Sequence, residues 1–177
     1  MQIEIPGYQT LTIDHLLLDY NGTIAEDGRI RNHVRELLIQ LSESLTIHVL
    51  TADTHGTAAA ECQGIPLLLD TFPTSDAASC KLQKLQETGA SCCACIGNGR
   101  NDLFMLKEAA LSIAVIDREG MYPPSCLTAI CVCTPPRKRW SSFFIRNGSS
   151  QDYVDKTTSG IGPKVLSPFS FLYLADS

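Results

Sequence analysis

An apolar run that ends on a carboxylate, residues 15 to 25 (HLLLDYNGTIA), constrains the fold more than any other segment of this chain. The leucines at 16 to 18 follow one another without a polar interruption, which is typical of a strand buried on both faces of a parallel sheet. Ligands bind at the carboxyl ends of such strands, where Asp19 stands. Gly22 and the amides after it predict a concave nest for an anion such as phosphate. An Asn-Gly pair is also a common turn, so this segment alone leaves both interpretations open.

Strand and helix patterns alternate along the chain. Two short strands around Pro6 and Gly7 predict an N-terminal hairpin at the sheet edge. Further strands are predicted at 45–51, 65–70, 92–97, 111–116 and 129–133, with helices at 30–44, 54–64, 75–89 and 101–110. Ser75 is the expected cap of the helix that Gly89 ends. The order predicts a three-layer, Rossmann-like α/β fold with a mainly parallel sheet.

Composition and charge narrow the class of protein. The chain has 177 residues, and its 44% share of hydrophobic side chains suffices for one core. No run approaches the roughly 18 apolar residues of a membrane span, and the N-terminus lacks a signal-peptide pattern. We therefore expect a cytoplasmic protein that does not contact a membrane. Residues 1–133 carry 8 Lys and Arg against 16 Asp and Glu, which argues against nucleic acid as a partner.

The chain changes character at residue 134. Residues 134–177 carry 6 Lys and Arg against 3 Asp and Glu, contain Pro, Ser and Gly throughout, and show no sustained period. We predict one folded domain over 1–133 and an irregular or disordered tail over 134–177. A shifted reading frame in the coding sequence would produce the same change.

Eight cysteines raise the possibility of a redox or zinc site. Cys92 and Cys95 have C-x-x-C spacing, but they lie before the end of a predicted strand, whereas redox pairs open a helix. No second metal-binding pair follows them. We expect the cysteines to be small core hydrophobes.

Polar residues stand at the predicted carboxyl ends of three strands. Asp19 closes the first long strand, Thr51 closes the second, and Asn98 and Asp102 lie in the GNGRND loop after the strand at 92–97. Lys81 lies in the helix before that loop. Parallel strands would bring these ends to one edge of the sheet. A carboxylate nucleophile, a hydroxyl, an ammonium and carboxylates for a metal ion are the groups that phosphoryl transfer requires.

The segments DYNGT, LTADT, a helical lysine and GNGRND, in this order, resemble the four motifs of the haloacid dehalogenase (HAD) superfamily. More narrowly, LDYNGTIA, VLTADTHGTA and IGNGRNDLFMLKEAALSIAVI are similar to small soluble proteins related to the phosphorylation domain of P-type ATPases. The resemblance covers residues 1–133 and makes them a HAD-like catalytic domain. It implies a Mg²⁺-dependent phosphohydrolase that acts through an aspartyl-phosphate.

The resemblance also implies a role for each matched residue. Asp19 would be the nucleophile, and Lys81 the cation, with Lys84 one turn later as the alternative. The implied catalytic residues are Asp19, Asn21, Thr51 and Lys81; those that bind phosphate are Gly22, Thr23, Thr51, Ala52 and Lys81; and those at the Mg²⁺ site are Asp19, Asn21, Asn98 and Asp102.

Two positions depart from the family pattern. Asn21 stands where family phosphatases usually have an Asp that protonates the leaving group, and an amide cannot transfer that proton at ordinary pH. Asn98 stands where an Asp normally binds Mg²⁺, so the site has one charge fewer for a hard cation. We expect slow hydrolysis and weak Mg²⁺ binding.

The spaces between the motifs are too short for an inserted cap domain, so we predict a capless, open site. Its substrate would be a small phosphorylated molecule or a phosphoprotein, and a neighbouring subunit of a homo-oligomer could close it. The two asparagines leave a non-catalytic phosphate-binding or regulatory relative as the alternative. A response-regulator receiver is rejected, because it would need an acidic pair after the first strand.

Overall fold

The computed structural model of the protein describes residues 1–5, 9–52, 56–116, 118, 120–133, 143–146 and 153–155. Within these residues, an eight-stranded sheet has the order β12-β11-β10-β9-β8-β3-β6-β7. Six of its strands are parallel: β3 (His15–Asp19), β6 (Thr46–Thr51), β7 (Leu68–Thr71), β8 (Cys93–Gly97), β9 (Leu111–Val115) and β10 (Cys131–Cys133). The strands β11 (Phe143–Arg146) and β12 (Tyr153–Asp155) continue the sheet in antiparallel pairing.

The leucine-rich strand β3 lies in the middle of this sheet. Its residue Leu18 pairs with Val49 of β6 on one side and with Ile96 of β8 on the other. Leu16, Leu17 and Leu18 are each at most 1% exposed, so the predicted strand buried on both faces is confirmed. The chain runs from β3 to β6 and β7, then returns to β8 on the opposite side of β3. The carboxyl ends of β3 and β8 therefore flank the point where strand order reverses, which is where open α/β sheets bind ligands.

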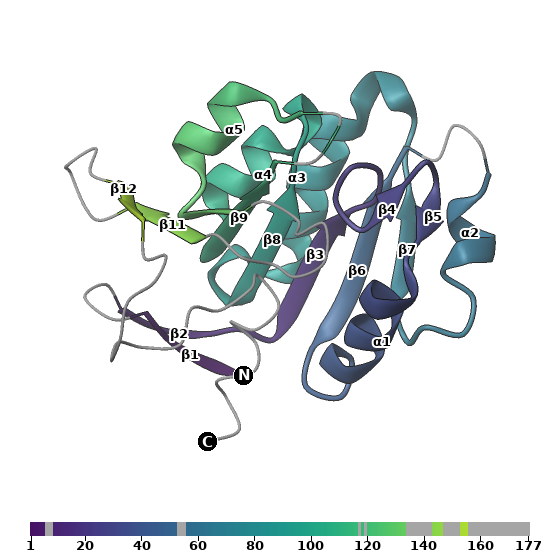
Figure 1. Ribbon diagram of the computed structural model, residues 1–177, viewed down its shortest axis with the longest axis horizontal. Coiled ribbons are helices and arrows are strands. Elements are labelled where there is room, and N and C mark those ends of the chain that lie inside the picture. The colour runs from purple at the N-terminus through teal and green to yellow at the C-terminus, as the bar shows by residue number, and fades with distance from the viewer. Residues whose placement is uncertain are drawn as a thin grey trace.

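Helices cover both faces of the sheet, as Figure 1 shows. On one face, α1 (Asn32–Leu41) buries Val34, Leu38 and Leu41. On the other lie α3 (Ala77–Thr88), α4 (Leu103–Glu108) and α5 (Pro123–Thr128). There Leu85 of α3 packs in one cluster with Leu17 and Leu50. The prediction of three layers around a mainly parallel sheet is confirmed.

Several elements differ from their predicted form. The hairpin of β1 (Gln2–Ile5) and β2 (Gln9–Thr12) forms a separate two-stranded sheet instead of an edge of the main one. Within the helix predicted at 54–64, residues 54 and 55 lie outside the described residues, and the rest forms α2 (Ala58–Glu61), which Gly64 follows with φ +80°. Ser75 lies in a 3₁₀ turn (Thr74–Asp76) and does not cap α3, whereas Gly89 ends α3 with φ +103°, as predicted.

A small hairpin leaves the sheet directly after the end of β3. It consists of β4 (Ala25–Glu26) and β5 (Arg29–Ile30), joined by Asp27 and Gly28, both with positive φ. This geometry is that of a tight hairpin turn, for which Asp-Gly is a preferred pair. We call residues 25–30 the flap.

The cysteines within the sheet are buried thiols. Cys93 and Cys95 lie in β8, and Cys131 and Cys133 lie in β10, all at most 1% exposed. Burial raises the pKa of Cys93 and of Cys131 to about 12. Such thiols are inert at neutral pH, which agrees with their interpretation as core residues.

The predicted tail, 134–177, lies mostly outside the described residues. Its two described segments are the strands β11 and β12. The predicted domain boundary at residue 133 stays a prediction. None of the helices in the described part of the chain is long and apolar enough to cross a membrane.

Candidate functional site

Three buried charged side chains meet at the carboxyl end of β3. Asp19 ends this strand, Lys81 comes from α3, and Asp102 follows the loop after β8. The Lys81 Nζ donates to Asp19 Oδ1 at 2.5 Å and to Asp102 Oδ1 at 2.6 Å. Lys81 and Asp102 are 0% exposed, and Asp19 is 7% exposed. Asp19 is therefore the member of this triad that solvent can still reach.

The charges within the triad stabilise one another. Burial alone would lower the pKa of Lys81, but Asp19 and then Asp102 raise it above its usual value. Burial, followed by the charge of Asp19, raises the pKa of Asp102 to about 6, while Lys81 acts in the opposite direction. Two carboxylates and one ammonium leave one net negative charge at pH 7. A buried ion cluster of this kind tolerates the loss of a partner poorly.

Asp102 also shapes the loop that leads to it. Its Oδ2 accepts hydrogen bonds from the amides of Asn98 at 3.1 Å and Gly99 at 2.8 Å. Gly97 allows this fold-back, because a Cβ at that position would lie 2.5 Å from the Asp102 Cγ. Both carboxylate oxygens of Asp102 thus have partners. Its observed role is to hold Lys81 and the loop.

The turn after Asp19 does not form the predicted nest of free amides. The amides of Thr23, Ile24 and Ala25 all donate to the carbonyl of Tyr20, and the amide of Gly22 donates to the carbonyl of Ala25. These amides close the turn that begins the flap, and the assignment of Gly22 and Thr23 to phosphate stays a prediction. Thr23 acts instead through its side chain, since its Oγ1 donates to Asp19 Oδ2 at 3.2 Å.

Gly22 and Asn98 lie in very close approach. A Cβ at Gly22 would be 2.0 Å from the Asn98 Nδ2, and Gly22 has φ +71°. A side chain at Gly22 would therefore be strained and would also displace the Asn98 amide. The absence of that side chain brings Asn98, from the loop after β8, against the turn that follows Asp19.

The other predicted residues lie near the same edge of the sheet. Thr51 ends β6 and is 2% exposed, and Ala52 follows it. The side chain of Asn21 is exposed. Lys84 points elsewhere, since its Nζ donates to Asp70 Oδ1 at 3.0 Å. Of the two candidate lysines, the structure brings Lys81 to Asp19.

The oxygen atoms around Asp19 fit a weakly held Mg²⁺. Among the described residues, no group of three or more His, Cys, Asp and Glu side chains is arranged to hold a metal ion. Asp102 holds Lys81 and the loop after β8, and the oxygens of Asp19 accept from Lys81 and Thr23. Asp19 is the more exposed of the two carboxylates, so it stays the candidate ligand, with the Asn98 amide and the backbone carbonyl of Asn21. Mg²⁺ is often held by one or two carboxylates and keeps several waters. This set suits a largely hydrated ion and gives no support to Asp102 as a direct ligand.

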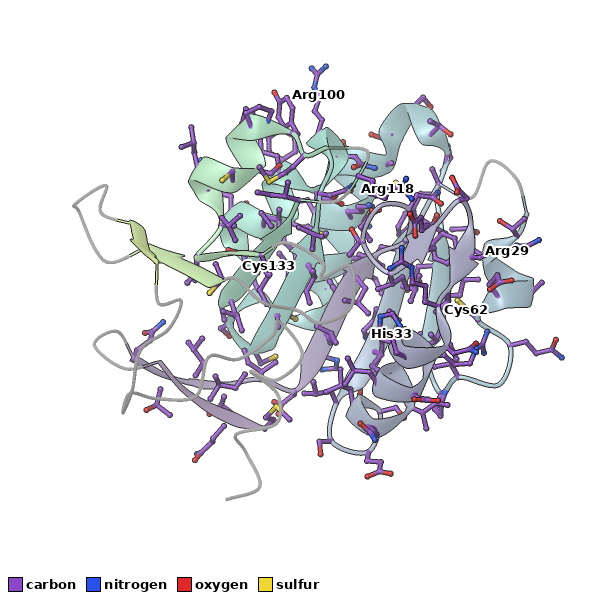
Figure 2. All side chains as sticks on the ribbon, in the orientation of Figure 1. Arg29, His33, Cys62, Arg100, Arg118 and Cys133 are labelled. Carbon is purple, nitrogen blue, oxygen red and sulfur yellow. The ribbon has the colours of Figure 1, made fainter. Side chains whose placement is uncertain are left out.

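Two features near the site were not predicted. The helix α5 contacts the loop after β8, because Ser125 Oγ donates to the Gly99 carbonyl at 3.0 Å. Glu26 of the flap forms an ion pair with Arg118 at 3.0 Å, and Figure 2 shows Arg118 beside the flap while Arg100 points away from the fold. Pro123 and Pro124 open α5 and were its one sequence signal, since proline is favoured in the first turn of a helix.

Known protein structures share the fold of this chain at low sequence identity. No protein-family model matches the chain. Over 39 residues, which are 22% of this chain and 89% of the other, it is 54% identical to an uncharacterized protein of Methanocaldococcus jannaschii. The name of that protein states no activity.

Three solved structures resemble the model over most of its described part. One is a protein of Streptomyces avermitilis assigned to the HAD family of hydrolases (20% identity, 68% of this chain and 75% of that one, TM-score 0.54). The second is 3-deoxy-D-manno-octulosonate 8-phosphate phosphatase of Moraxella catarrhalis in complex with magnesium ion, phosphate ion and the KDO molecule (16% identity, 68% of this chain and 75% of that one, TM-score 0.53). The third is the cobalt-bound deoxy-D-mannose-octulosonate 8-phosphate phosphatase of Haemophilus influenzae (14% identity, 68% of this chain and 77% of that one, TM-score 0.55). The chain therefore has the α/β fold of the HAD-superfamily hydrolases, the fold that its four motifs predict.

Proposed function

We propose that the chain is a slow phosphohydrolase of the HAD type that acts through an aspartyl-phosphate on Asp19. The observation that carries the proposal is the buried triad, in which Lys81 holds the one partly exposed carboxylate at the switch point of the sheet. The fold, which is shared with phosphatases, supports it. The narrower likeness to the phosphorylation domain of P-type ATPases stays a prediction.

The proposed reaction has two displacements. A carboxylate oxygen of Asp19 attacks phosphorus and forms a P–O bond, while the bond from phosphorus to the leaving alcohol breaks. A water then attacks phosphorus, which releases inorganic phosphate and restores the carboxylate. Lys81 orients Asp19 for the first step and offsets part of the negative charge that gathers at the site. A Mg²⁺ ion, when bound through Asp19 and Asn98, would neutralise charge on the phosphoryl oxygens.

Proton transfer is the weak part of this machinery. The leaving oxygen needs a proton in the first displacement, and the attacking water must lose one in the second. General acid–base catalysis typically contributes about 10² to 10⁴ in rate, and the amide of Asn21 cannot supply it. In the proposed mechanism, the protein still binds the phosphate ester and Asp19 still attacks phosphorus, but turnover is slow and favours esters with good leaving groups.

The test is hydrolysis of an aryl and an alkyl phosphate, with and without Mg²⁺, by the wild type and by Asp19→Asn. We expect slow, Mg²⁺-stimulated hydrolysis of the aryl ester, and none by the variant, because an amide is not a nucleophile here. Asp14→Asn is the matched control, since the Asp14 side chain is 58% exposed and lies at the opposite end of β3. Equal activity of the Asp19→Asn variant and the wild type would remove Asp19 from the mechanism.

A second variant separates slow catalysis from its alternative, a phosphate-binding relative without activity, which Asn21 and Asn98 favour. Asn21→Asp should raise turnover of the alkyl ester by tenfold or more, within the range for acid–base catalysis, and should affect the aryl ester less. No hydrolysis by the wild type or by Asn21→Asp, combined with measurable phosphate binding, would favour the non-catalytic relative.

The expected substrate is a small phosphorylated molecule or a phosphoprotein. In the described residues, the connections that leave the carboxyl edge of the sheet beside Asp19 hold the flap and α1, or α2 and β7, and neither is a cap domain. The second subunit of a homo-oligomer could close such a site. Light scattering at several protein concentrations, together with the ester panel, tests both parts of this proposal.

A further inference from the structure

The backbone amides and carbonyls of two consecutive residues after β8, Asn98 and Gly99, all have hydrogen-bond partners within the protein. The amides of Asn98 and Gly99 donate to Asp102 Oδ2 at 3.1 and 2.8 Å. The carbonyl of Asn98 accepts from the amide of Tyr122 at 2.9 Å, and the carbonyl of Gly99 accepts from Ser125 Oγ at 3.0 Å. Loops usually satisfy much of their backbone with water. The Gly99 carbonyl also accepts from the amide of Asp102 at 3.3 Å, so five hydrogen bonds from within the protein hold these two residues.

Ser125, which donates to the Gly99 carbonyl, is itself held in place. Ser125 is 0% exposed, its amide donates to the carbonyl of Tyr122, and its carbonyl accepts from the amide of Ala129 at 3.0 Å. The amide of Ile130, just after α5, donates to Ser112 Oγ of β9 at 3.0 Å. The hydroxyl of Ser125 is thus presented to the loop by a helix whose far end is tied to the sheet.

The position of this loop decides where the Asn98 side chain lies. Its Nδ2 lies 2.0 Å from the point that a Cβ of Gly22 would occupy, so the loop and the turn after Asp19 meet without room for a side chain at Gly22. A shift of about 1 Å in the loop backbone would separate Asn98 from that turn. Misplacement on this scale can lower a rate by about 10²-fold.

We infer that Ser125 is a positioning residue, which holds the Asn98–Gly99 segment so that Asn98 faces the turn after Asp19. This inference rests on the proposed function for its catalytic consequence. Ser125 touches neither substrate nor Asp19, and it acts through the Gly99 carbonyl.

The test uses Ser125→Ala, which removes the donor, and Ser125→Thr, which keeps a hydroxyl. Thr128→Val is the matched control, because Thr128 Oγ1 donates to the Pro124 carbonyl inside the same helix and does not contact the loop. In Ser125→Ala we expect the amides of Asn98 and Gly99 to exchange hydrogen at least tenfold faster. We also expect kcat for an aryl phosphate to fall by about 10- to 100-fold with little change in KM.

The Thr variant should recover most of the lost kcat, and the Thr128→Val variant should match the wild type in both measurements. Unchanged exchange at Asn98 and Gly99 in Ser125→Ala would overturn the structural part of the inference. Faster exchange with unchanged kcat would overturn the positioning role. If the wild type hydrolyses no ester, the proposed function fails and the catalytic consequence fails with it, while hydrogen exchange still tests the contact.

Discussion

The two lysines of α3 offer the sharpest test of the site, because they have the same side chain, the same helix and different surroundings. Lys81 is 0% exposed between Asp19 and Asp102, whereas Lys84 is 25% exposed beside Asp70, which is 26% exposed. Substitution of each by methionine keeps an unbranched apolar stem and removes only the ammonium group. The comparison therefore measures what each ammonium contributes.

Lys81→Met leaves two carboxylates in a buried site without their cation. Breaking a buried ion pair costs about 3–5 kcal/mol. For a domain of this length, each kcal/mol lowers Tm by about 2–4 °C, so we expect a fall of about 6–20 °C. Lys84→Met breaks a partly exposed pair, worth about 0–1 kcal/mol, and should lower Tm by no more than about 4 °C.

Thermal unfolding at pH 7 and hydrolysis of an aryl phosphate at a temperature where both variants are folded provide the measurements. Lys81→Met should have no detectable turnover, and Lys84→Met should retain the wild-type rate. Combining Lys81→Met with Asp102→Asn should recover part of the Tm but none of the activity, since one of the two unpaired charges is gone. Equal losses of Tm in the two single variants would refute the burial argument. An inactive Lys84→Met beside an active Lys81→Met would transfer the cationic role to Lys84.

Two further predictions concern Gly22 and His48. Gly22→Ala and Gly64→Ala both place a side chain at positive φ, a strain of about 1–2 kcal/mol; at Gly64 nothing lies within 4 Å of the new Cβ. Only Gly22→Ala should also abolish phosphatase activity, and equal activity of the two variants would contradict the close approach to Asn98. Burial, followed by the charge of Lys84, lowers the pKa of His48 below 6.5. As the pH falls, the unfolded chain therefore binds a proton at His48 at a higher pH than the folded protein does. Stability should therefore fall as the pH drops below 6.5, by up to about 1.4 kcal/mol per pH unit, until the folded pKa is passed. Urea unfolding from pH 7.5 to 5 should show this slope in the wild type and a smaller one in His48→Gln; identical slopes would reject His48 as its source. The titratable groups around His48 are His15, Asp70 and Lys84.

The central strands could be predicted from sequence because burial on both faces leaves a signal that does not depend on neighbours. The leucine run before Asp19 and the CACIG segment at 93–97 are such cases, and every residue of β8 is buried. Lys81 could also be singled out, because Ala77, Lys81 and Leu85 are spaced four residues apart and form the buried stripe of α3. A lysine on such a stripe needs buried partners, and the strand-end carboxylates provide them.

The parts that could not be predicted depend on backbone hydrogen bonds between segments distant in sequence. From sequence, the amides after Asp19 could have formed a nest. In the structure they donate to the carbonyls of Tyr20 and Ala25, because the pairing of the flap fixes the turn. The role of Ser125 required knowing that α5 packs against the loop 26 residues before it. The commitment of both Asp102 oxygens likewise follows from Gly97, which allows the chain to fold back at the end of β8.

The charge of the side chain at position 98 acts in opposite directions on metal and on phosphate, which makes Mg²⁺-dependent phosphate binding an informative experiment. A carboxylate at position 98 would attract Mg²⁺ and repel a phosphate dianion, whereas the amide of Asn98 does neither strongly. With Asp102 neutralised in part by Lys81, the site has one net negative charge for phosphate to overcome. Under the proposed function, Asn98 would therefore lower the dependence of phosphate binding on the metal, and Asn21 would lower turnover once phosphate is bound. Both changes favour occupancy over release. Phosphate binding that is largely independent of Mg²⁺ in the wild type, and that becomes dependent on it in Asn98→Asp, is the behaviour this charge balance requires.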